Sequence, residues 1–194
     1  MYNYVVLFHN FIKMTLILVL VVILVLGFLY YIRLNNKIVS LEETVGNAWS
    51  DIDVQLRMRF DLVDNLVETV KAYAKHEKDT FKEVVEARNK FATATDVKSK
   101  AEADNMLSAS LKSLFALSEA YPELKANENF LSLQSELSDI ENKIASARRY
   151  FNAATREYNT LIKQFPADIL FHKEPKDYFE GIEEAKKAPK VKFD

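Results

Sequence analysis

One segment near the start of the chain limits what the rest can fold into. Residues 14–32 read MTLILVLVVILVLGFLYYI, a run without a charged side chain between Lys13 and Arg33. At a helical rise of about 1.5 Å per residue, this run is roughly 28 Å long, which matches the hydrocarbon thickness of a bilayer. A core helix of a soluble protein keeps a polar stripe, and this run has none. We therefore predict a transmembrane helix over residues 14–32.

A cleaved signal peptide is the alternative interpretation of this run. The apolar part of a signal peptide is about 7–15 residues long and is followed by small residues at a cleavage site. Here the run is longer and continues into YYIRLNN. Tyr30 and Tyr31 lie at its end, where aromatic rings favour the headgroup region. We expect Tyr30, Tyr31 and Arg33 to anchor the helix at the membrane interface.

The basic residues that flank the span predict its orientation. Arg33 and Lys37 follow the span, whereas Lys13 alone precedes it. Lys and Arg near the ends of a span favour the cytoplasmic side. We therefore expect the N-terminus outside and the long C-terminal part in the cytoplasm. Met1 and Met14 both stay open as the first residue, and a start at Met14 would exclude Lys13.

The composition of the chain excludes several kinds of chemistry. Its 194 residues contain no Cys, which excludes disulfides, Cys-ligated metals and a thiol nucleophile. Three glycines are too few for a Gly-rich phosphate-binding loop, and a net charge of −2 lacks the basic excess that nucleic-acid binding needs. The three histidines form no Glu-x-x-His motif, and no G-x-S-x-G motif occurs. We expect no catalytic residue, metal, cofactor or nucleic-acid partner, and therefore no enzyme.

Apolar residues recur with helical spacing through most of the chain after the anchor. The four series of these residues span positions 34–52, 66–91, 107–121 and 130–165. The fourth is the most regular, because it follows alternating steps of 3 and 4 from Phe130 to Phe165. Four amphipathic helices with short connections favour an antiparallel up-and-down bundle. The predicted fold class is all-α: a transmembrane helix followed by a four-helix bundle with long helices.

Local signals predict where these helices begin and end. Asp61 or Asp64 would cap a second helix, and one unbroken helix through this point is the alternative. Ser99 opens a capping-box pattern with Glu102, and Pro122 is predicted to end that helix. The predicted organisation is a flank (1–13), a transmembrane helix (14–32), a bundle (33–165) and an irregular tail (166–194), whose residues 177–182 pack against the bundle.

The densest set of polar residues lies in WSDIDVQLRMRFDLVDNLVE. Asp53, Arg57 and Asp61 are spaced four apart, as in exposed ion pairs on one helix, so a solvated face is the simpler interpretation. A docking surface is the functional one, in which Trp49 would serve as an anchor rather than a core residue. The candidate interaction surface comprises Trp49, Asp51, Asp53, Arg57, Arg59, Asp61, Asn65 and Glu68.

Longer stretches of the sequence resemble the LemA family. The resemblance lies in AWSDIDVQLRMRFDLVDNLVETVKAYAKHE (residues 48–77), in residues 117–166, and in the later DYFEG and APKVKF. It implies a single-pass protein of the bacterial cell membrane with a four-helix bundle and no established active site. Two positions depart from the family pattern: Asp64 stands where members usually have Pro, and Ala72 where they commonly have Gly.

The expected function is a membrane-tethered helical module that recruits or regulates an envelope protein. The resemblance implies a membrane protease of the HtpX type as one such partner, because members often occur beside these proteases. The alternative is a structural scaffold that self-associates as a homo-oligomer and organises the membrane. A receptor for a small ligand between the helices is a third hypothesis. The expected partners are the lipid bilayer, a membrane or envelope protein and further copies of the chain.

Overall fold

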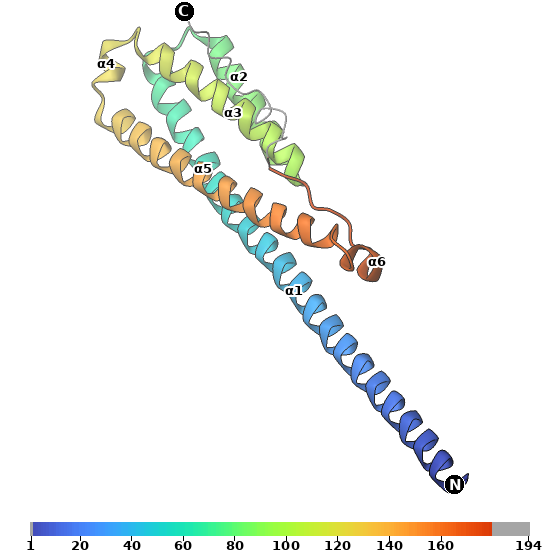
Figure 1. The fold of residues 1–194 in the computed structure, drawn as a ribbon. Coiled ribbons are helices and arrows are strands. Elements are labelled where there is room, and N and C mark those ends of the chain that lie inside the picture. Colours follow the sequence, from blue (N-terminus) through green and yellow to red (C-terminus); the bar gives the residue numbers. More distant parts are fainter. Residues whose placement is uncertain (1, 180–194) are drawn as a thin grey trace, which may run out of the picture.

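The computed structural model describes residues 2–179, and most of these residues are helical. Figure 1 shows one long rod, α1, against which the shorter helices are gathered at its C-terminal end. In chain order the helices are α1 (Tyr2–Tyr73), α2 (Lys78–Thr93), α3 (Val97–Ser118), α4 (Pro122–Lys125), α5 (Glu128–Ile162) and α6 (Ala167–Phe171).

The first two predicted bundle segments meet in one helix, so of the two alternatives at Asp61–Asp64 the unbroken helix is confirmed and the break is not. α1 runs unbroken to Tyr73. With no proline at this point, each backbone N–H remains available for the helical hydrogen bonds. Asp64 caps no helix, and its carboxylate instead accepts a hydrogen bond of 2.6 Å from Arg88 of α2. The chain turns at residues 74–77, inside the segment predicted as the second helix.

The N-terminal part of α1 projects away from the bundle (Figure 1). Among the described residues, α1 is the helix that is long and apolar enough to cross a membrane, and its most apolar 18-residue window is 0% buried. Leu24 and Phe28 are typical, with 63% and 64% of their surfaces exposed. Tyr30 and Tyr31 are also exposed, at the point where the bundle begins. This part of α1 makes no core of its own within the protein.

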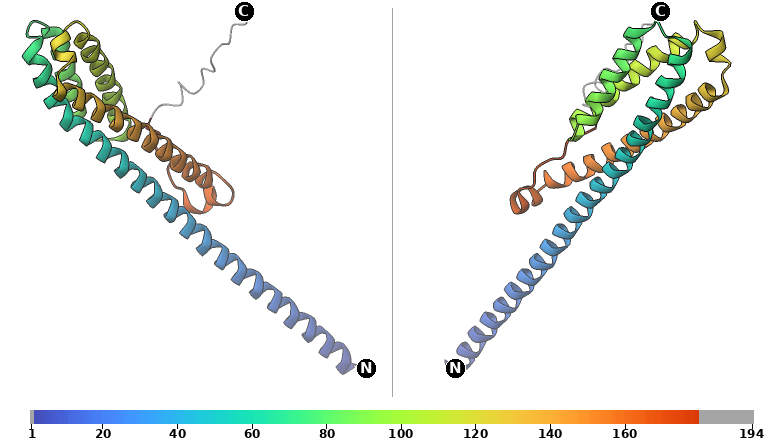
Figure 2. Two further views of the ribbon diagram at one scale, coloured as in Figure 1. Left: turned by 90° about the vertical axis from the view of Figure 1, so that its left-hand side faces the viewer. Right: turned by 180° about the vertical axis from the view of Figure 1, so that it is seen from behind.

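The bundle has the predicted up-and-down arrangement. Its four long helices are the C-terminal half of α1, together with α2, α3 and α5. Figure 2 shows α5 returning antiparallel along α1, while the hairpin of α2 and α3 packs at the end far from the N-terminus. Because α2 and α3 are shorter than α5, the four helices lie side by side only in the membrane-distal part of the bundle (Figures 1 and 2).

Several predicted helix ends shift by a few residues. Asp96 caps α3: its carboxylate accepts a hydrogen bond of 2.9 Å from the Ser99 amide, and the Ser99 hydroxyl accepts one from the Asp96 amide. The capping box therefore begins three residues before the predicted Ser99. Pro122 is the first residue of α4 rather than the end of α3. α5 ends at Ile162, which leaves Phe165 outside the helix and 80% exposed.

The buried apolar residues form two clusters, which we call the proximal and the distal core. The proximal core consists of Leu34, Ile38, Leu41, Val45, Ala48, Ile52, Leu56, Phe91, Ala101, Ala103, Ile140, Ile144, Phe151, Ala154, Tyr158, Ile162, Ala167 and Phe179. The distal core consists of Val63, Leu66, Val67, Val70, Ala74, Phe81, Val84, Ala87, Leu107, Leu111, Leu114, Leu124, Phe130 and Leu137. Every residue of the predicted 34–52 stripe is buried.

The segment after α5 is more ordered than the predicted irregular tail. It forms the short helix α6 and then turns at His172, whose φ of 44° places it in the left-handed region. Residues 172–179, which we call the strap, return along the bundle. Phe179 at the end of the strap is 1% exposed, which confirms that this part of the tail packs against the bundle. Residues 180–182 of the same prediction lie outside the described residues.

Candidate functional site: a grooved seam between α1 and α5

Three hollows follow one side of the contact between α1 and α5. The α1 residues that line them fall on one face of the helix, at steps of three and four or their sums. Because α5 is antiparallel to α1, its lining residues run in the opposite order. The proximal hollow is lined by Lys37, Leu41, Ala153, Arg156, Glu157, Thr160, Leu161 and Gln164. The middle hollow is lined by Asp51, Gln55, Asn142, Lys143, Ser146 and Ala147.

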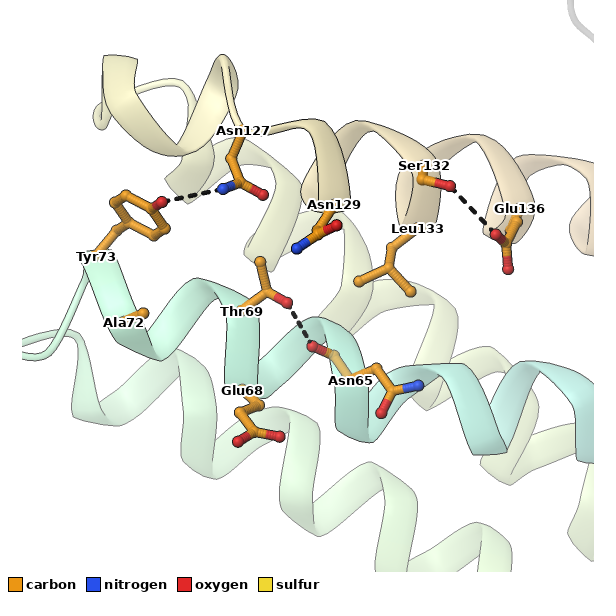
Figure 3. A pocket seen from close by; sticks show the side chains of 10 residues that line it. All are labelled: Asn65, Glu68, Thr69, Ala72, Tyr73, Asn127, Asn129, Ser132, Leu133 and Glu136. Atoms are coloured by element: carbon orange, nitrogen blue, oxygen red, sulfur yellow. Dashed lines mark hydrogen bonds between the residues drawn. The ribbon is translucent and has the colours of Figure 1, made fainter.

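The distal hollow is the largest of the three, with a volume of about 590 Å³. It is an open groove between the last turns of α1 and the first turns of α5 (Figure 3). Its lining residues are Asn65, Glu68, Thr69, Ala72, Tyr73, Asn127, Asn129, Ser132, Leu133 and Glu136. Asn65 and Glu68 belong to the predicted interaction surface.

One wall of the distal groove is fixed by the cap of α5. Asn127 accepts a hydrogen bond of 3.0 Å from the Phe130 amide, which satisfies a free N–H at the start of the helix. The Asn127 side-chain amide in turn donates to the Tyr73 hydroxyl at 3.0 Å, so the same residue ties α5 to the end of α1. Figure 3 shows this bond across the end of the groove. The wall is therefore held from both helices.

The chemistry of the distal groove favours a cationic or amide-rich ligand. Glu68 and Glu136 supply carboxylates, and none of the described residues that line the groove is Lys or Arg. Ser132 donates to the Glu136 carboxylate at 3.3 Å, while the Thr69 hydroxyl is directed back to the Asn65 carbonyl at 2.8 Å. The proximal hollow differs, because Lys37 and Arg156 line it beside Glu157, which pairs with Lys37 at 3.2 Å. The seam thus changes from mixed charge near the membrane to acidic at the far end.

The other predicted surface residues have different environments. Trp49 packs in the proximal core, with its ring 5.7 Å from that of Phe151 and 6.0 Å from that of Phe179. Of the two interpretations of Trp49, a core residue or a docking anchor, the structure therefore agrees with the core residue. Asp51 lines the middle hollow, and Asp61 is exposed on α1. The predicted interaction surface thus grouped residues that in the structure lie partly in the core and partly on different sides of α1.

Asp53 is a partly buried residue that pairs with two cations, Arg57 and Lys100. It accepts a hydrogen bond of 2.8 Å from Arg57 and is paired with Lys100 of α3. Burial alone would raise the pKa of Asp53, but the hydrogen bonds from Lys100 and Arg57 hold it below its usual value. The Lys100 ammonium also lies 5.7 Å from the centre of the Trp49 ring. Asp53 therefore fastens α3 to α1.

Arg59 does not belong to a surface, because it is 1% exposed. Its guanidinium is paired with the carboxylate of Asp104 on α3. It also donates at 2.6 Å to the Glu141 carboxylate of α5 and at 2.9 Å to the Ser108 hydroxyl. Asp104 is fully buried and pairs with Arg148 of α5 as well. We call Arg59, Asp104 and Arg148 the buried ion cluster; it links α1, α3 and α5.

The sequence does indicate the buried ion cluster, through charged residues at positions of the apolar stripes rather than through the spacing of opposite charges. Arg59 falls three residues after Leu56 and four before Val63, so it occupies a core position of the α1 stripe. Asp104 likewise falls three residues before Leu107, on the apolar face of α3. A charged residue at a core position needs a buried partner, because burying an isolated charge is costly. Two such positions of opposite sign predict a pair.

The described residues offer no arrangement for metal binding. No group of three or more His, Asp or Glu side chains within residues 2–179 is placed to hold a metal ion. The acidic groove therefore has two carboxylates facing solvent rather than a closed ligand set.

Comparison with known proteins places the chain among relatives. It is 27% identical over 161 residues to the magnetosome protein MamQ of Magnetospirillum gryphiswaldense, covering 70% of this chain and 59% of MamQ. It is 25% identical over 158 residues to protein LemA of Metamycoplasma hominis, covering 80% of this chain and 72% of that protein. The match thus spans less than two thirds of MamQ. Because residues 48–193 match the family as a whole, the chain belongs to the LemA family.

Proposed function

We propose that this protein is a membrane-anchored adaptor that binds a membrane protein through the distal groove of the α1–α5 seam. The observation that carries this proposal is that Glu68 and Glu136 both line an open polar groove, and that none of the described residues lining it is Lys or Arg. The groove lies at the end of the bundle far from the transmembrane segment of α1 (Figure 1). A bound partner would therefore be held at the membrane-distal end of the bundle.

The partner segment that fits this groove is basic. Two carboxylates and three Asn side chains offer acceptors and amide groups to Lys, Arg and an extended backbone. A cytoplasmic loop of a membrane protein has this character, because such loops are enriched in Lys and Arg. This argument agrees with the cytoplasmic orientation that Arg33 and Lys37 favour. A membrane protease of the HtpX type is the first partner to test, as the family resemblance implies.

The test is capture of that protease by the full-length protein from co-expressing membranes. We expect Glu68→Lys combined with Glu136→Lys to reduce capture by at least tenfold, because repulsion replaces attraction. Glu83→Lys is the matched control, since Glu83 is exposed on α2 away from the groove. Equal capture by the groove variant and the control would refute the groove as the binding site.

Self-association and orientation are tested in the same preparation. Copies that carry two different affinity tags would be recovered together if the chain forms a homo-oligomer, which would favour the scaffold hypothesis. For orientation, Tyr150→Cys places a single thiol on α5, where Tyr150 is 54% exposed. A membrane-impermeant maleimide should label it only after cell lysis. Labelling of intact cells would place the bundle outside and direct the search to envelope proteins.

A further inference from the structure

The turn around α6 presents an unusual concentration of exposed apolar side chains. Phe165 is 80% exposed, Ile169 60% and Leu170 46%. These three residues lie within six positions of the chain, in the sequence FPADIL. Ala167, in the same turn, is buried in the proximal core, so the turn is seated on the bundle and directs its larger side chains outward. Such a patch marks an interaction site.

The position of this turn identifies what it meets. The ring of Phe171, at the end of α6, stacks on the ring of Tyr31 of α1, with centroids 5.1 Å apart and planes at 21°. Tyr31 is the second-to-last residue of the uncharged run, two residues before Arg33. Figures 1 and 2 show α6 at the end of the bundle from which the N-terminal part of α1 projects. The turn therefore lies at the level where the transmembrane segment leaves the bundle.

We propose that the α6 turn inserts Phe165, Ile169 and Leu170 into the headgroup layer of the bilayer, as a second membrane contact beside the transmembrane helix. The partner is a lipid surface, because Phe171, the residue after the patch, stacks on Tyr31 at the end of the exposed apolar surface of α1. This inference rests on the membrane anchoring in the proposed function and not on partner capture by the distal groove. α6 would then be the second point at which the protein contacts the membrane.

The charges of the turn fix how deep it goes. Asp168 is exposed between the apolar residues, and a carboxylate in the hydrocarbon core is costly. Lys163 precedes the turn and Lys173 follows it, where Lys173 pairs with Glu42 of α1 at 3.1 Å. Apolar side chains between flanking lysines are typical of segments that lie in the membrane interface. The turn thus lies flat among the headgroups rather than crossing them.

A second membrane contact would limit how far the bundle can lean and rotate relative to the membrane. A single transmembrane helix leaves the bundle free to lean and to rotate about the span. With α6 in the interface, rotation is limited, because Phe165 and Ile169 would have to leave the lipid. The α1–α5 seam would then face a defined direction relative to the membrane plane.

The experiment uses the absence of native cysteines. Full-length protein with Ile169→Cys carries a nitroxide in nanodiscs of phosphatidylcholine and phosphatidylglycerol. We measure its collision rates with oxygen, which concentrates in lipid, and with a water-soluble nickel chelate. The ratio of oxygen to nickel collisions should be several-fold higher than at Tyr150→Cys, an exposed position of α5. Phe165→Cys should reproduce this result, which guards against an effect of one substitution.

Two outcomes would overturn the proposal. A ratio equal to that at Tyr150→Cys would place α6 in water, and low collision rates with both reagents would place it against protein, such as a second copy. Leu24→Cys, within the transmembrane segment, serves as the reference for lipid. If the ratio at Leu24→Cys also indicates water, residues 14–32 do not span the membrane. If only the α6 positions indicate water, the transmembrane helix is supported and the second membrane contact at α6 is refuted.

Discussion

The two cores of the bundle are built in different ways. The distal core draws on α1, α2, α3, α4 and α5, so its apolar stripes are enclosed by helices on all sides. The proximal core is mainly the contact of α1 with α5, to which α2 and α3 contribute only their adjoining ends. Here Phe179 of the strap and Ala167 of α6 complete the enclosure. The segment after α5 thus covers the part of the proximal core that the α2–α3 pair does not reach.

This difference teaches why the tail folds back. Figure 1 shows the strap running from α6 to the near end of the α2–α3 pair, so it covers the part of the seam that the pair leaves open. Asn159 fixes the strap through two hydrogen bonds with the Lys176 backbone, at 2.8 Å and 2.9 Å. Asn152 accepts from the Phe179 amide at 3.0 Å. Side chains of α5 therefore satisfy the strap as a neighbouring strand or helix would.

The buried ion cluster lies where the two cores meet, and its loss should have the largest effect. Asp104→Ala removes the carboxylate with which both Arg59 and Arg148 pair in the interior. Removing one side of a buried ion pair costs about 3–5 kcal/mol, so the free energy of unfolding should fall by that amount. Urea unfolding of the full-length protein in detergent micelles, followed by circular dichroism, measures it.

The control for this prediction is Glu102→Ala, because Glu102 is an exposed neighbour of Asp104 on α3. A surface substitution of this kind changes stability by less than about 0.5 kcal/mol. If the two variants unfold at the same urea concentration, the cluster does not stabilise the junction of the two cores.

Phe179→Ala should affect the proximal core alone. The Phe179 ring is 1% exposed and lies 5.0 Å from the Arg148 guanidinium, so its removal leaves both Trp49 and Arg148 partly uncovered. Burial of a Phe side chain is worth about 1.5–3 kcal/mol. We expect the strap to detach and the emission of Trp49, the single Trp, to shift to longer wavelength.

The distal core supplies the control for the strap. Hydrogen exchange should rise in residues 172–178 of Phe179→Ala while protection of the distal helices stays unchanged. Uniform loss of protection across both cores would mean that the bundle unfolds as one unit. That result would contradict the independence of the two regions.

Much of this architecture could be predicted from spacing alone. The apolar stripes on α1 and α5 identified the all-α fold, and Leu34, Ile38 and Leu41 are buried as their period requires. Spacing left both a break near Asp64 and an unbroken helix open, because a capping residue permits a helix start without requiring one. The turn at residues 74–77 has the sequence AKHE, which contains neither Gly nor Pro. Local signals could therefore not locate it.

The candidate site was less predictable, because it depends on which helices become neighbours. Asn65 and Glu68 were recognised as polar residues, but the groove needs Asn127 and Glu136 from a helix about sixty residues away. Arg59 was grouped with exposed charges, since a list of charges within one segment ignores the helical face on which each lies. The strap and α6 depend on contacts with α1 that no spacing within the tail reveals.

Two cations of one carboxylate provide a finer comparison. Lys100 and Arg57 both contact Asp53, but the Lys100 side chain is 13% exposed and that of Arg57 71%. Lys100→Met should lower the free energy of unfolding by about 1–2 kcal/mol, because a partly buried charged hydrogen bond and its contact with Trp49 are lost. Arg57→Ala should cost about 0.2–0.5 kcal/mol, as exposed pairs on one helix do. Equal losses in urea unfolding would show that burial does not separate the two pairs.

The smallest effect concerns the ion pairs that fasten the strap to α1. Glu42 contacts Lys176 at 2.9 Å and Lys173 at 3.1 Å, and hydrogen bonds from these two cations lower the pKa of Glu42 below its usual 4.5. A lowered pKa means that the carboxylate stabilises the docked strap above pH 4.5, and that this contribution is lost as the pH falls through the lowered value. Because the pairs are largely exposed, the contribution is below about 1 kcal/mol.

Hydrogen exchange of the strap as a function of pH, corrected for the intrinsic exchange rate, separates Glu42 from other acids. The hydrogen bond with the Glu42 carboxylate in turn raises the pKa of Lys176, so the attraction should persist through neutral pH and weaken again only in strong base. Glu42→Gln should remove the acid-dependent part of strap release, whereas Glu43→Gln, at the exposed next position, should keep it. An unchanged acid profile in Glu42→Gln would assign the pH dependence to Asp53, whose pKa is also lowered and whose partner Lys100 contacts the same core. The strap would then be held by Phe179 and its backbone hydrogen bonds alone, and charge would contribute only to the junction of α1 with α3.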